Sequence, residues 1–335
     1  MAEYKVLVTG PSWIGDMVMA QSLFKYLQKT SEKELIIDVL APAWTLPVVN
    51  RMPEVRKGIK FDSRHGKLDL KLRYSIGKGL KQQQYDEAII IPRTLKAVLP
   101  SWFAGIKKIT GYQSNFGLVN NIKSYRKSRK ELFVKRYLSL ALDNAYQLNQ
   151  SEIPVPELIV DELKKKELLE TYSLKIKNYV VFAPGAEFGP SKQWPMDNFA
   201  ALAELLEGKG LQVIILGSDK EREHAESIMQ ISSSNDILNL CGKTTLENVI
   251  DIMSGSTGVV ANDSGLMHLA YASGAKVYAL YGSSSPEYTP PLSTTAHIFQ
   301  HKLSCQPCFE RTCRYDHYQC LTGINAEQVA DKISL

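Results

Sequence analysis

The sequence predicts an α/β protein built from two doubly wound parallel sheets. Short runs of β-branched and apolar residues alternate with helical segments along most of the 335 residues, which is typical of parallel strands joined by helices. The alternation weakens between residues 147 and 170, where Pro154 and Pro156 precede a charged segment, and then begins again. We therefore expect two domains, each large enough to bury its own core.

The composition excludes several classes of protein. The chain is 44% hydrophobic and 22% charged, which excludes a disordered chain, and 40 Lys+Arg against 35 Asp+Glu give a net charge of +5. No apolar run reaches the roughly 18–20 residues that a membrane span needs. The first apolar stretch is broken by Gly10 and Pro11, so a secretory signal is not expected. We expect a soluble, cytoplasmic protein.

Hydrophobic periodicity places the elements of both domains. An amphipathic helix is expected from Asp16 to Lys29, with further helices over Met196–Glu207 and Lys220–Ile231. The predicted strands are Tyr4–Thr9, Leu35–Ala41, Ala88–Ile91, Tyr179–Ala183, Gln212–Leu216, Gly258–Ala261 and Lys276–Leu280. Open α/β sheets bind ligands beyond the carboxyl ends of their strands, so the loops that follow these strands are the candidate sites.

The first candidate loop runs from Gly10 to Asp16. Its glycines permit close approach of the backbone to a ligand, and a helix begins at its end. An acidic residue such as Asp16 also stabilises the first turn of a helix without any ligand, so both interpretations stay open. The loop lacks the G-x-G-x-x-G pattern of dinucleotide-binding proteins.

Two further loops follow strands of the second domain. In the loop from Pro184 to Pro195, Lys192 is either solvated or held over a phosphate. Asp263, Ser264 and Gly265 open a helix whose N–H groups suit an anion, although an N-cap without a ligand explains them as well. His268 lies one turn into this helix, where a structural histidine is the usual case.

Three motifs in these loops resemble one protein family. The segments GPSWIGDMVMAQSL (10–23), PGAEFGPSKQWP (184–195) and NDSGLMHLA (262–270) are similar to those of the ADP-heptose:lipopolysaccharide heptosyltransferases, glycosyltransferase family 9, and closest to its type II members. YGSSSPEYTPPL (281–292) fits the same family. The resemblance implies a GT-B fold, in which two Rossmann-like domains face each other across a cleft. It implies an acceptor domain at 1–172, an ADP-sugar domain at 173–322, and a C-terminal helix at 323–335 that packs back on the first domain.

The resemblance also implies a reaction and its residues. Members of this family, found in Gram-negative bacteria, transfer heptose with inversion from ADP-L-glycero-D-manno-heptose to the lipopolysaccharide inner core, here to its first heptose, and Asp16 matches the expected general base. The implied donor-binding residues are Lys192, Glu221, Asp263, Ser264, Gly265, Leu266 and His268. The acceptor-side candidates are Ser12, Trp13, Gly15, Arg93, Lys96 and Arg126. The acceptor, of the Kdo2-lipid A type, implies transient contact with the cytoplasmic face of the inner membrane.

Candidate metal ligands are expected only outside the active site. The chain has no D-x-D pair for a nucleotide-bound divalent ion, so we expect no metal in the active site and no cofactor required for catalysis. The other candidate is a cluster of cysteines near the C-terminus, with His317 as a further ligand. Its members, Cys305, Cys308, Cys313 and Cys320, suit either structural zinc or reduced thiols.

Alternative functions remain open at this point. The basic stretch Lys123–Arg136, with four Lys and three Arg, is either a solvated face or a site for an anionic partner, and no nucleic-acid-binding motif accompanies it. One alternative is another GT-B sugar-nucleotide transferase, including heptosyltransferases of type I or III, or an epimerase. A non-enzymatic, basic, zinc-stapled adaptor is the other. A phosphotransferase with a P-loop at Gly242–Thr244 is excluded, because Ile237 stands where that motif needs glycine.

Overall fold

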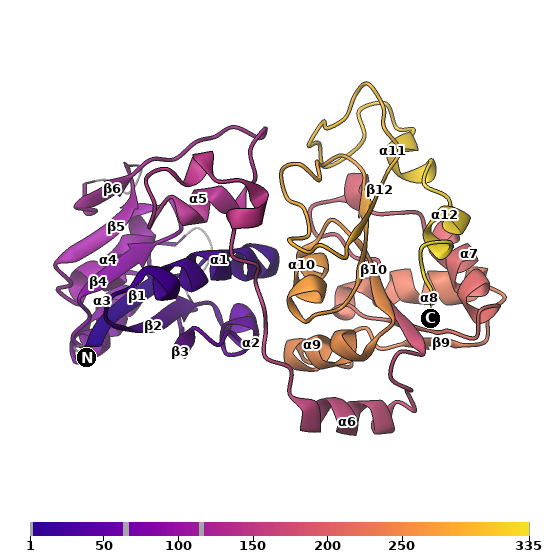
Figure 1. Ribbon diagram of the computed structural model, residues 1–335, viewed down its shortest axis with the longest axis horizontal. Helices are drawn as coiled ribbons and strands as arrows, with labels where there is room; N and C mark the ends of the chain where they lie inside the picture. Colours follow the sequence, from indigo (N-terminus) through magenta and orange to yellow (C-terminus); the bar gives the residue numbers. More distant parts are fainter. Residues whose placement is uncertain (1–2, 63–66, 114–116, 335) are drawn as a thin grey trace. The chain divides into compact units, whose positions relative to one another are not determined.

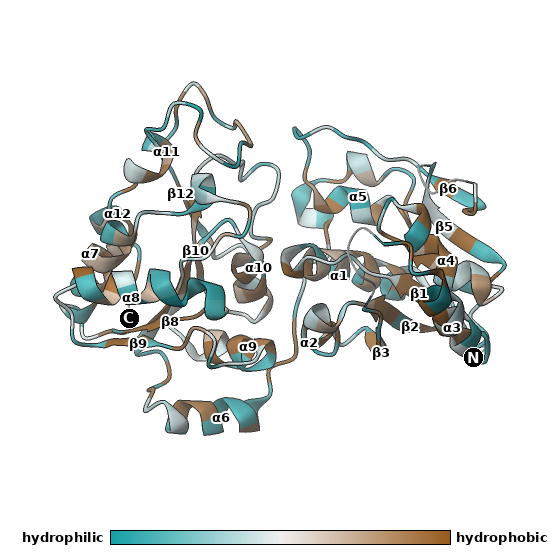
Figure 2. Ribbon diagram, turned by 180° about the vertical axis from the view of Figure 1, so that it is seen from behind, coloured by the Kyte–Doolittle hydropathy of each residue, from teal (hydrophilic) through white to brown (hydrophobic). Residues whose placement is uncertain are grey.

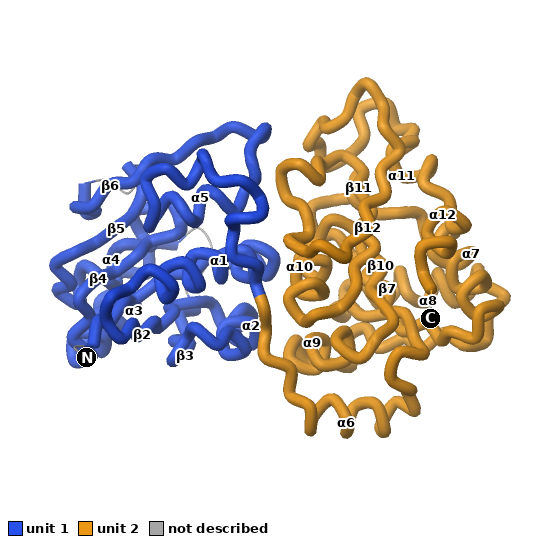
Figure 3. The backbone as a smooth tube through the Cα atoms, in the orientation of Figure 1, with its two compact units in different colours: residues 1–156 blue, residues 157–335 orange. Residues whose placement is uncertain are grey.

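The computed structural model describes residues 3–62, 67–113 and 117–334. The chain, coloured along its sequence in Figure 1, divides into two compact units, residues 1–156 and 157–335, which Figure 3 shows in different colours. Each unit contains a six-stranded, wholly parallel sheet with helices packed around it. This confirms the predicted α/β class with two doubly wound sheets.

Unit 1 contains a sheet in the order β3-β2-β1-β4-β5-β6. Its strands are β1 (Glu3–Thr9), β2 (Glu34–Ala41), β3 (Val55–Lys60), β4 (Glu87–Ile90), β5 (Lys108–Tyr112) and β6 (Asn121–Lys123). Strands β2 and β3 are added in turn on one side of β1, and β4, β5 and β6 are then added on its other side. The strand order therefore reverses between β1 and β4, and this switch point is where such sheets bind ligands.

The helices of unit 1 connect these strands. They are α1 (Ile14–Thr30), α2 (Leu46–Val49), α3 (Leu70–Lys81), α4 (Leu95–Phe103) and α5 (Val134–Leu138). Short 3-10 turns lie at η1 (Ala43–Thr45), η3 (Ala145–Gln147) and η4 (Gln150–Glu152). Helices α3 and α4 pack closely, because Gly77 of α3 leaves no room for a Cβ atom, which would lie 2.7 Å from the carbonyl oxygen of Pro100.

Unit 2 repeats the plan with the order β12-β11-β10-β7-β8-β9. Its strands are β7 (Tyr179–Ala183), β8 (Gln212–Ile215), β9 (Ile237–Asn239), β10 (Gly258–Asn262), β11 (Val277–Tyr281) and β12 (His297–Gln300). Here the order reverses between β7 and β10, so the loops that follow these two strands begin at the same switch point.

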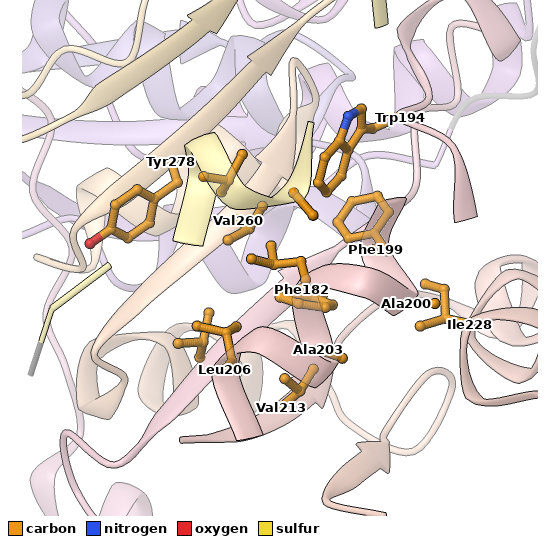
Figure 4. Close-up of a cluster of buried hydrophobic side chains, with 14 of the residues drawn as sticks. Phe182, Trp194, Phe199, Ala200, Ala203, Leu206, Val213, Ile228, Val260 and Tyr278 are labelled. Atoms are coloured by element: carbon orange, nitrogen blue, oxygen red, sulfur yellow. The ribbon is translucent and has the colours of Figure 1, made fainter. Parts of the chain in front are cut away.

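The helices of unit 2 surround a core that includes its C-terminal segment. They are α6 (Glu162–Thr171), α7 (Met196–Glu207), α8 (Arg222–Ile231), α9 (Leu246–Gly255), α10 (Gly265–Ala272), α11 (Gln319–Thr322) and α12 (Ala326–Ala330), with 3-10 turns η5 (Pro190–Lys192) and η6 (Asp219–Glu221). Figure 4 shows Trp194, Phe199 and Phe182 together in this core, where all three are fully buried. The Trp194 and Phe199 rings meet edge to face at 4.8 Å.

The boundary between the compact units differs from the predicted domain boundary. The first unit ends at Pro156 rather than at residue 172, because α6 packs on α9 of unit 2 and Leu168 is buried there. The C-terminal segment packs on α7 of unit 2, where Val329 and Ile333 join the core and the indole of Trp194 donates to the Ile324 carbonyl at 2.9 Å.

Hydropathy follows this architecture. Figure 2 shows the central strands mostly brown and the outer helix α8 largely teal, as expected for sheets covered by amphipathic helices. Strands β7, β10 and β11 are buried along their whole length. Among the described residues, no helix is long and apolar enough to cross a membrane.

Candidate functional site

Unit 1 contains a candidate site where β1 ends. Gly10 packs tightly there, and a Cβ atom would lie 2.6 Å from Cε of Met17 and 3.2 Å from Val39. Asp16 lies in the first turn of α1 and is half-buried. The hydroxyl of Tyr137, from α5, donates to Oδ1 of Asp16 at 2.5 Å. The carboxylate is thus positioned both by its own helix and by a side chain from 121 residues further along the chain.

Two exposed tryptophans border this carboxylate loop. The side chains of Trp13 and Trp44 are 59% and 55% exposed, and the Trp44 indole donates to the Ser12 carbonyl at 2.7 Å. Large exposed aromatic faces suit contact with the apolar faces of sugars. Trp13, Ser12 and the buried Gly15 were expected in this loop, whereas Trp44 and Tyr137 were not. The only signal for Trp44 was an aromatic residue just after the strand that ends at Ala41.

The predicted acceptor-side cations are only partly brought together. The Arg93 guanidinium lies 3.9 Å from the centre of the Tyr125 ring, and it lines a hollow together with Lys123 and Lys127. Arg126 turns instead to Glu131 at 3.2 Å and stacks on another tyrosine. Lys96 is half-buried in the first turn of α4.

The basic stretch 123–136 is partly structural. The side chain of Arg136 is 7% exposed, lies against the rings of Tyr125 and Phe133, and donates to the Ser128 carbonyl at 3.1 Å. Lys123 forms an ion pair with Asp143 at 2.8 Å. Part of this positive charge therefore holds the local fold, while Lys127, Arg129 and Lys130 remain exposed.

Unit 2 contains a candidate site of its own, which centres on an ion pair. Lys192, from the loop after β7, places Nζ 2.5 Å from Oδ2 of Asp263, which follows β10. Their side chains are 17% and 4% exposed. The ammonium also lies 5.0 Å from the centre of the Phe188 ring. The structure thus joins two predicted residues that are 71 positions apart, at the switch point of the sheet.

The loop that carries Lys192 is tied to the sheet. Asn262, at the end of β10, is fully buried, accepts from the Trp194 backbone N–H at 3.0 Å and donates to the Pro184 carbonyl at 2.6 Å. Gly189 has φ +144°, and a Cβ there would lie 2.6 Å from the Arg311 carbonyl oxygen. These contacts fix both ends of the loop.

Helix α10 begins two residues after Asp263, and buried polar atoms without hydrogen-bond partners lie at and near its N-terminus. Among the described residues, Oγ of Ser264 and Nδ1 of His268 are buried and unpaired, as is Oγ of Ser284 after β11. Burial lowers the pKa of His268 to about 4, an effect that nearby Asp263 opposes and Lys192 reinforces. The imidazole is therefore neutral near pH 7. Unpaired polar atoms beside a helix N-terminus indicate a polar ligand site.

Glu221 stabilises the start of the 3-10 turn η6. Its carboxylate accepts from the backbone and the hydroxyl of Ser218, at 2.8 and 2.6 Å, and so closes a capping box. Cβ atoms on Gly185 or Gly217 would each lie 2.7 Å from its side chain. Glu221 therefore lies directly against the loop that follows β7.

The cysteine cluster forms a small cavity beside the Lys192 loop. Cys305, Cys308, Cys313 and Cys320 are free thiols and line this cavity with Ser191 and Ser283. Burial, followed by the neighbouring cysteines, raises the pKa of Cys320 to about 11, while backbone N–H donors lower the pKa of Cys313. No three His, Cys, Asp or Glu side chains in the described part of the chain are placed to hold a metal ion. This placement gives no support to the zinc alternative for the four cysteines.

Comparisons with known proteins agree with this geometry. Residues 73–319 match the family described as glycosyltransferase family 9 (heptosyltransferase). The chain is 40% identical over 307 residues to lipooligosaccharide heptosyltransferase 2 of Haemophilus influenzae, covering 88% of each protein. The solved structure of E. coli ADP-heptose LPS heptosyltransferase II matches with a TM-score of 0.86 at 36% identity, covering 98% of this chain and 97% of that one. E. coli heptosyltransferase WaaC with ADP shares the fold at 17% identity, with a TM-score of 0.72 and 98% of each chain covered. The expected GT-B fold is thereby confirmed.

Proposed function

The chain belongs to glycosyltransferase family 9 and is a heptosyltransferase, and from this premise we propose that Asp16 is its general base. The donor in this proposal is ADP-L-glycero-D-manno-heptose, and the acceptor is the first heptose of the lipopolysaccharide inner core. The observation that carries the proposal is the pairing of Asp16 with Tyr137 at the end of β1. A half-buried carboxylate held in one orientation suits removal of a proton from a hydroxyl.

The proposed reaction is a single displacement. An acceptor hydroxyl transfers its proton to Asp16 while its oxygen forms a bond to the anomeric carbon of heptose. The bond from that carbon to the phosphate oxygen breaks, and ADP leaves with the bonding electrons. Attack from the face opposite the departing phosphate inverts the anomeric configuration.

Unit 2 supplies groups that suit the departing diphosphate. In this proposal Lys192 and the first N–H groups of α10, at Ser264, Gly265 and Leu266, stabilise the developing negative charge. The neutral His268 donates or accepts a hydrogen bond near the phosphates. This set of donors supplies positive potential from the chain itself, so we propose transfer without a required metal or cofactor.

The remaining donor and acceptor contacts complete the proposal. Glu221 lies against the loop after β7, where its free carboxylate oxygen suits the ribose hydroxyls of ADP. On the acceptor side, Trp13 stacks on a core sugar, and Arg93 and Lys127 attract its acidic groups. Ser12, Gly15, Lys96 and Arg126 remain acceptor candidates. Because the acceptor is anchored in lipid, we place the protein at the cytoplasmic face of the inner membrane.

The test is transfer of heptose from ADP-heptose to an acceptor that ends in the first core heptose. We expect Asp16→Asn to lower kcat by about 10²–10⁴ while ADP binding, measured by calorimetry, is unchanged. The matched control, Asp236→Asn, removes an exposed carboxylate of unit 2 and should retain full activity. Wild-type activity in Asp16→Asn would exclude the assigned base, and ADP binding without any transfer would exclude the assigned acceptor.

A further inference from the structure

An apolar surface lies on the solvent side of α3 and α4 in unit 1. Leu70, Tyr74 and Trp102 are 50%, 55% and 50% exposed there. Tyr74 lies one helical turn after Leu70 on the same face of α3. The Tyr74 ring meets Phe103 of α4 edge to face at 5.4 Å, and Phe103 meets Trp102 at 5.1 Å. The exposed side chains therefore form one continuous patch, which we call the α3–α4 face, rather than scattered residues.

Positive charge surrounds the α3–α4 face. Lys78 continues the stripe of Leu70 and Tyr74 along α3, and Lys71 adjoins it. Lys67 and Lys81 are also exposed, and none of these four lysines forms an ion pair with a described residue. Residues 67–81 and 95–108 contain eight basic residues and one acidic residue, which is the N-cap of α3. Of these eight, Arg73 is buried and Lys108 pairs with Glu87, so the other six supply the surface charge.

Helices α3 and α4 have apolar side chains on two sides, whereas an amphipathic surface helix has them only on the side that faces the core. The opposite sides of α3 and α4 already pack into the unit 1 core, through residues that include Leu80 and Val98. The outward apolar residues thus contribute nothing to that core. Tyrosine and tryptophan favour the boundary between lipid and water, and lysines beside them reach anionic headgroups while their stems cover apolar surface.

We propose that the α3–α4 face is the surface with which this protein docks on an anionic lipid bilayer. This inference deepens the proposed function and rests on it, because the proposed acceptor is anchored in such a bilayer. Trp102 and Tyr74 enter the headgroup region, and Lys71 and Lys78 bind lipid phosphates. Charge complementarity selects an anionic membrane as the occupant, since a patch of one sign repels a second copy of itself.

The test is co-sedimentation of the full chain with vesicles. Wild type should pellet with an equal mixture of phosphatidylglycerol and phosphatidylethanolamine, and not with phosphatidylcholine alone. Tyr74→Ser/Trp102→Ser and Lys71→Glu/Lys78→Glu should each weaken the binding about tenfold or more. Salt should release the wild type, because exposed charges are screened. The matched controls are Leu163→Ser and Lys166→Glu, exposed residues of α6 that should bind as wild type.

Activity assays separate this inference from the proposed function. The Tyr74→Ser/Trp102→Ser variant should retain wild-type turnover on a soluble, lipid-free core acceptor and lose it on the acceptor embedded in vesicles. Asp16→Asn should bind vesicles normally while its rate of transfer falls about 10²–10⁴-fold on both acceptors. The docking surface would be overturned if wild type did not bind anionic vesicles, or if the variants of the α3–α4 face bound them like wild type. A wild-type dimer in sedimentation that the Tyr74→Ser/Trp102→Ser variant loses would also overturn it, in favour of a second copy.

Discussion

At the ion pair between Lys192 and Asp263, the effect of the lysine on protein stability can be measured separately from its effect on ADP binding. Lys192→Met keeps most of the side-chain volume but leaves the Asp263 carboxylate, which is 4% exposed, without its cation. An unpaired buried charge of this kind costs about 3–5 kcal/mol of stability. Replacing both members, in Lys192→Met/Asp263→Asn, removes the charge as well as its partner. The double variant should therefore lose less than about 2 kcal/mol.

The tryptophans of the chain provide a selective probe for this comparison. Trp13, Trp44 and Trp102 are 59%, 55% and 50% exposed, whereas Trp194 is fully buried in unit 2. The red shift of fluorescence during urea unfolding consequently reports mainly on the unit that contains the ion pair. ADP binding, measured by calorimetry on the same variants, reports on the ligand site.

The two measurements should diverge. Stability falls in Lys192→Met and recovers in the double variant, whereas ADP affinity falls about 10–150-fold in both, because both lack the charged donor. A double variant as unstable as Lys192→Met would show that the lysine stabilises the loop by packing rather than by charge. Recovery of ADP affinity in the double variant would refute the assignment of Lys192 to the diphosphate.

Two further predictions concern single side chains. Tyr137→Phe removes the donor to Asp16, so we expect kcat to fall about tenfold with an unchanged KM for ADP-heptose, and the acidic limb of the pH–rate profile to move to higher pH. An unchanged profile would mean that the hydroxyl does not act on the base. Burial lowers the pKa of His268 to about 4, so the folded state binds fewer protons than the unfolded chain between about pH 6.5 and 4. The free energy of unfolding should therefore fall by up to about 3 kcal/mol as the pH drops through this range. Urea unfolding of wild type and His268→Gln at several pH values checks this, and equal pH dependence in the two would contradict it.

The central strands were predictable because they are buried on both faces. β7 and β10 read as continuous apolar runs, which sequence periodicity detects directly. The outer strands β3 and β12 escaped prediction, since β3 contains three polar residues and a glycine and β12 is only partly buried. An edge strand is held by pairing with its neighbour rather than by its own apolar side chains.

The candidate site shows a similar division between local and long-range information. Asp16, Lys192 and Asp263 follow strand ends, so their places were predictable from the alternation of strands and helices. Tyr137 was not, because its contact with Asp16 spans 121 residues and no local pattern marks it. The packing of the C-terminal segment into the unit 2 core was not predictable, because its apolar residues identify a buried face without identifying the surface that covers it.

Asp263 has a further consequence for the donor site. An ammonium has three N–H donors. The Asp263 carboxylate at 2.5 Å accepts from one and the Asp263 carbonyl at 3.5 Å from a second, so Lys192 retains one donor for a phosphate oxygen. The pairing fixes a long, flexible side chain in advance and so reduces the entropy that is lost when a ligand binds. It also cancels most of the lysine's net charge. The N–H groups at the start of α10 must therefore provide a large share of the positive potential, and binding of the diphosphate depends on the lysine and the helix together.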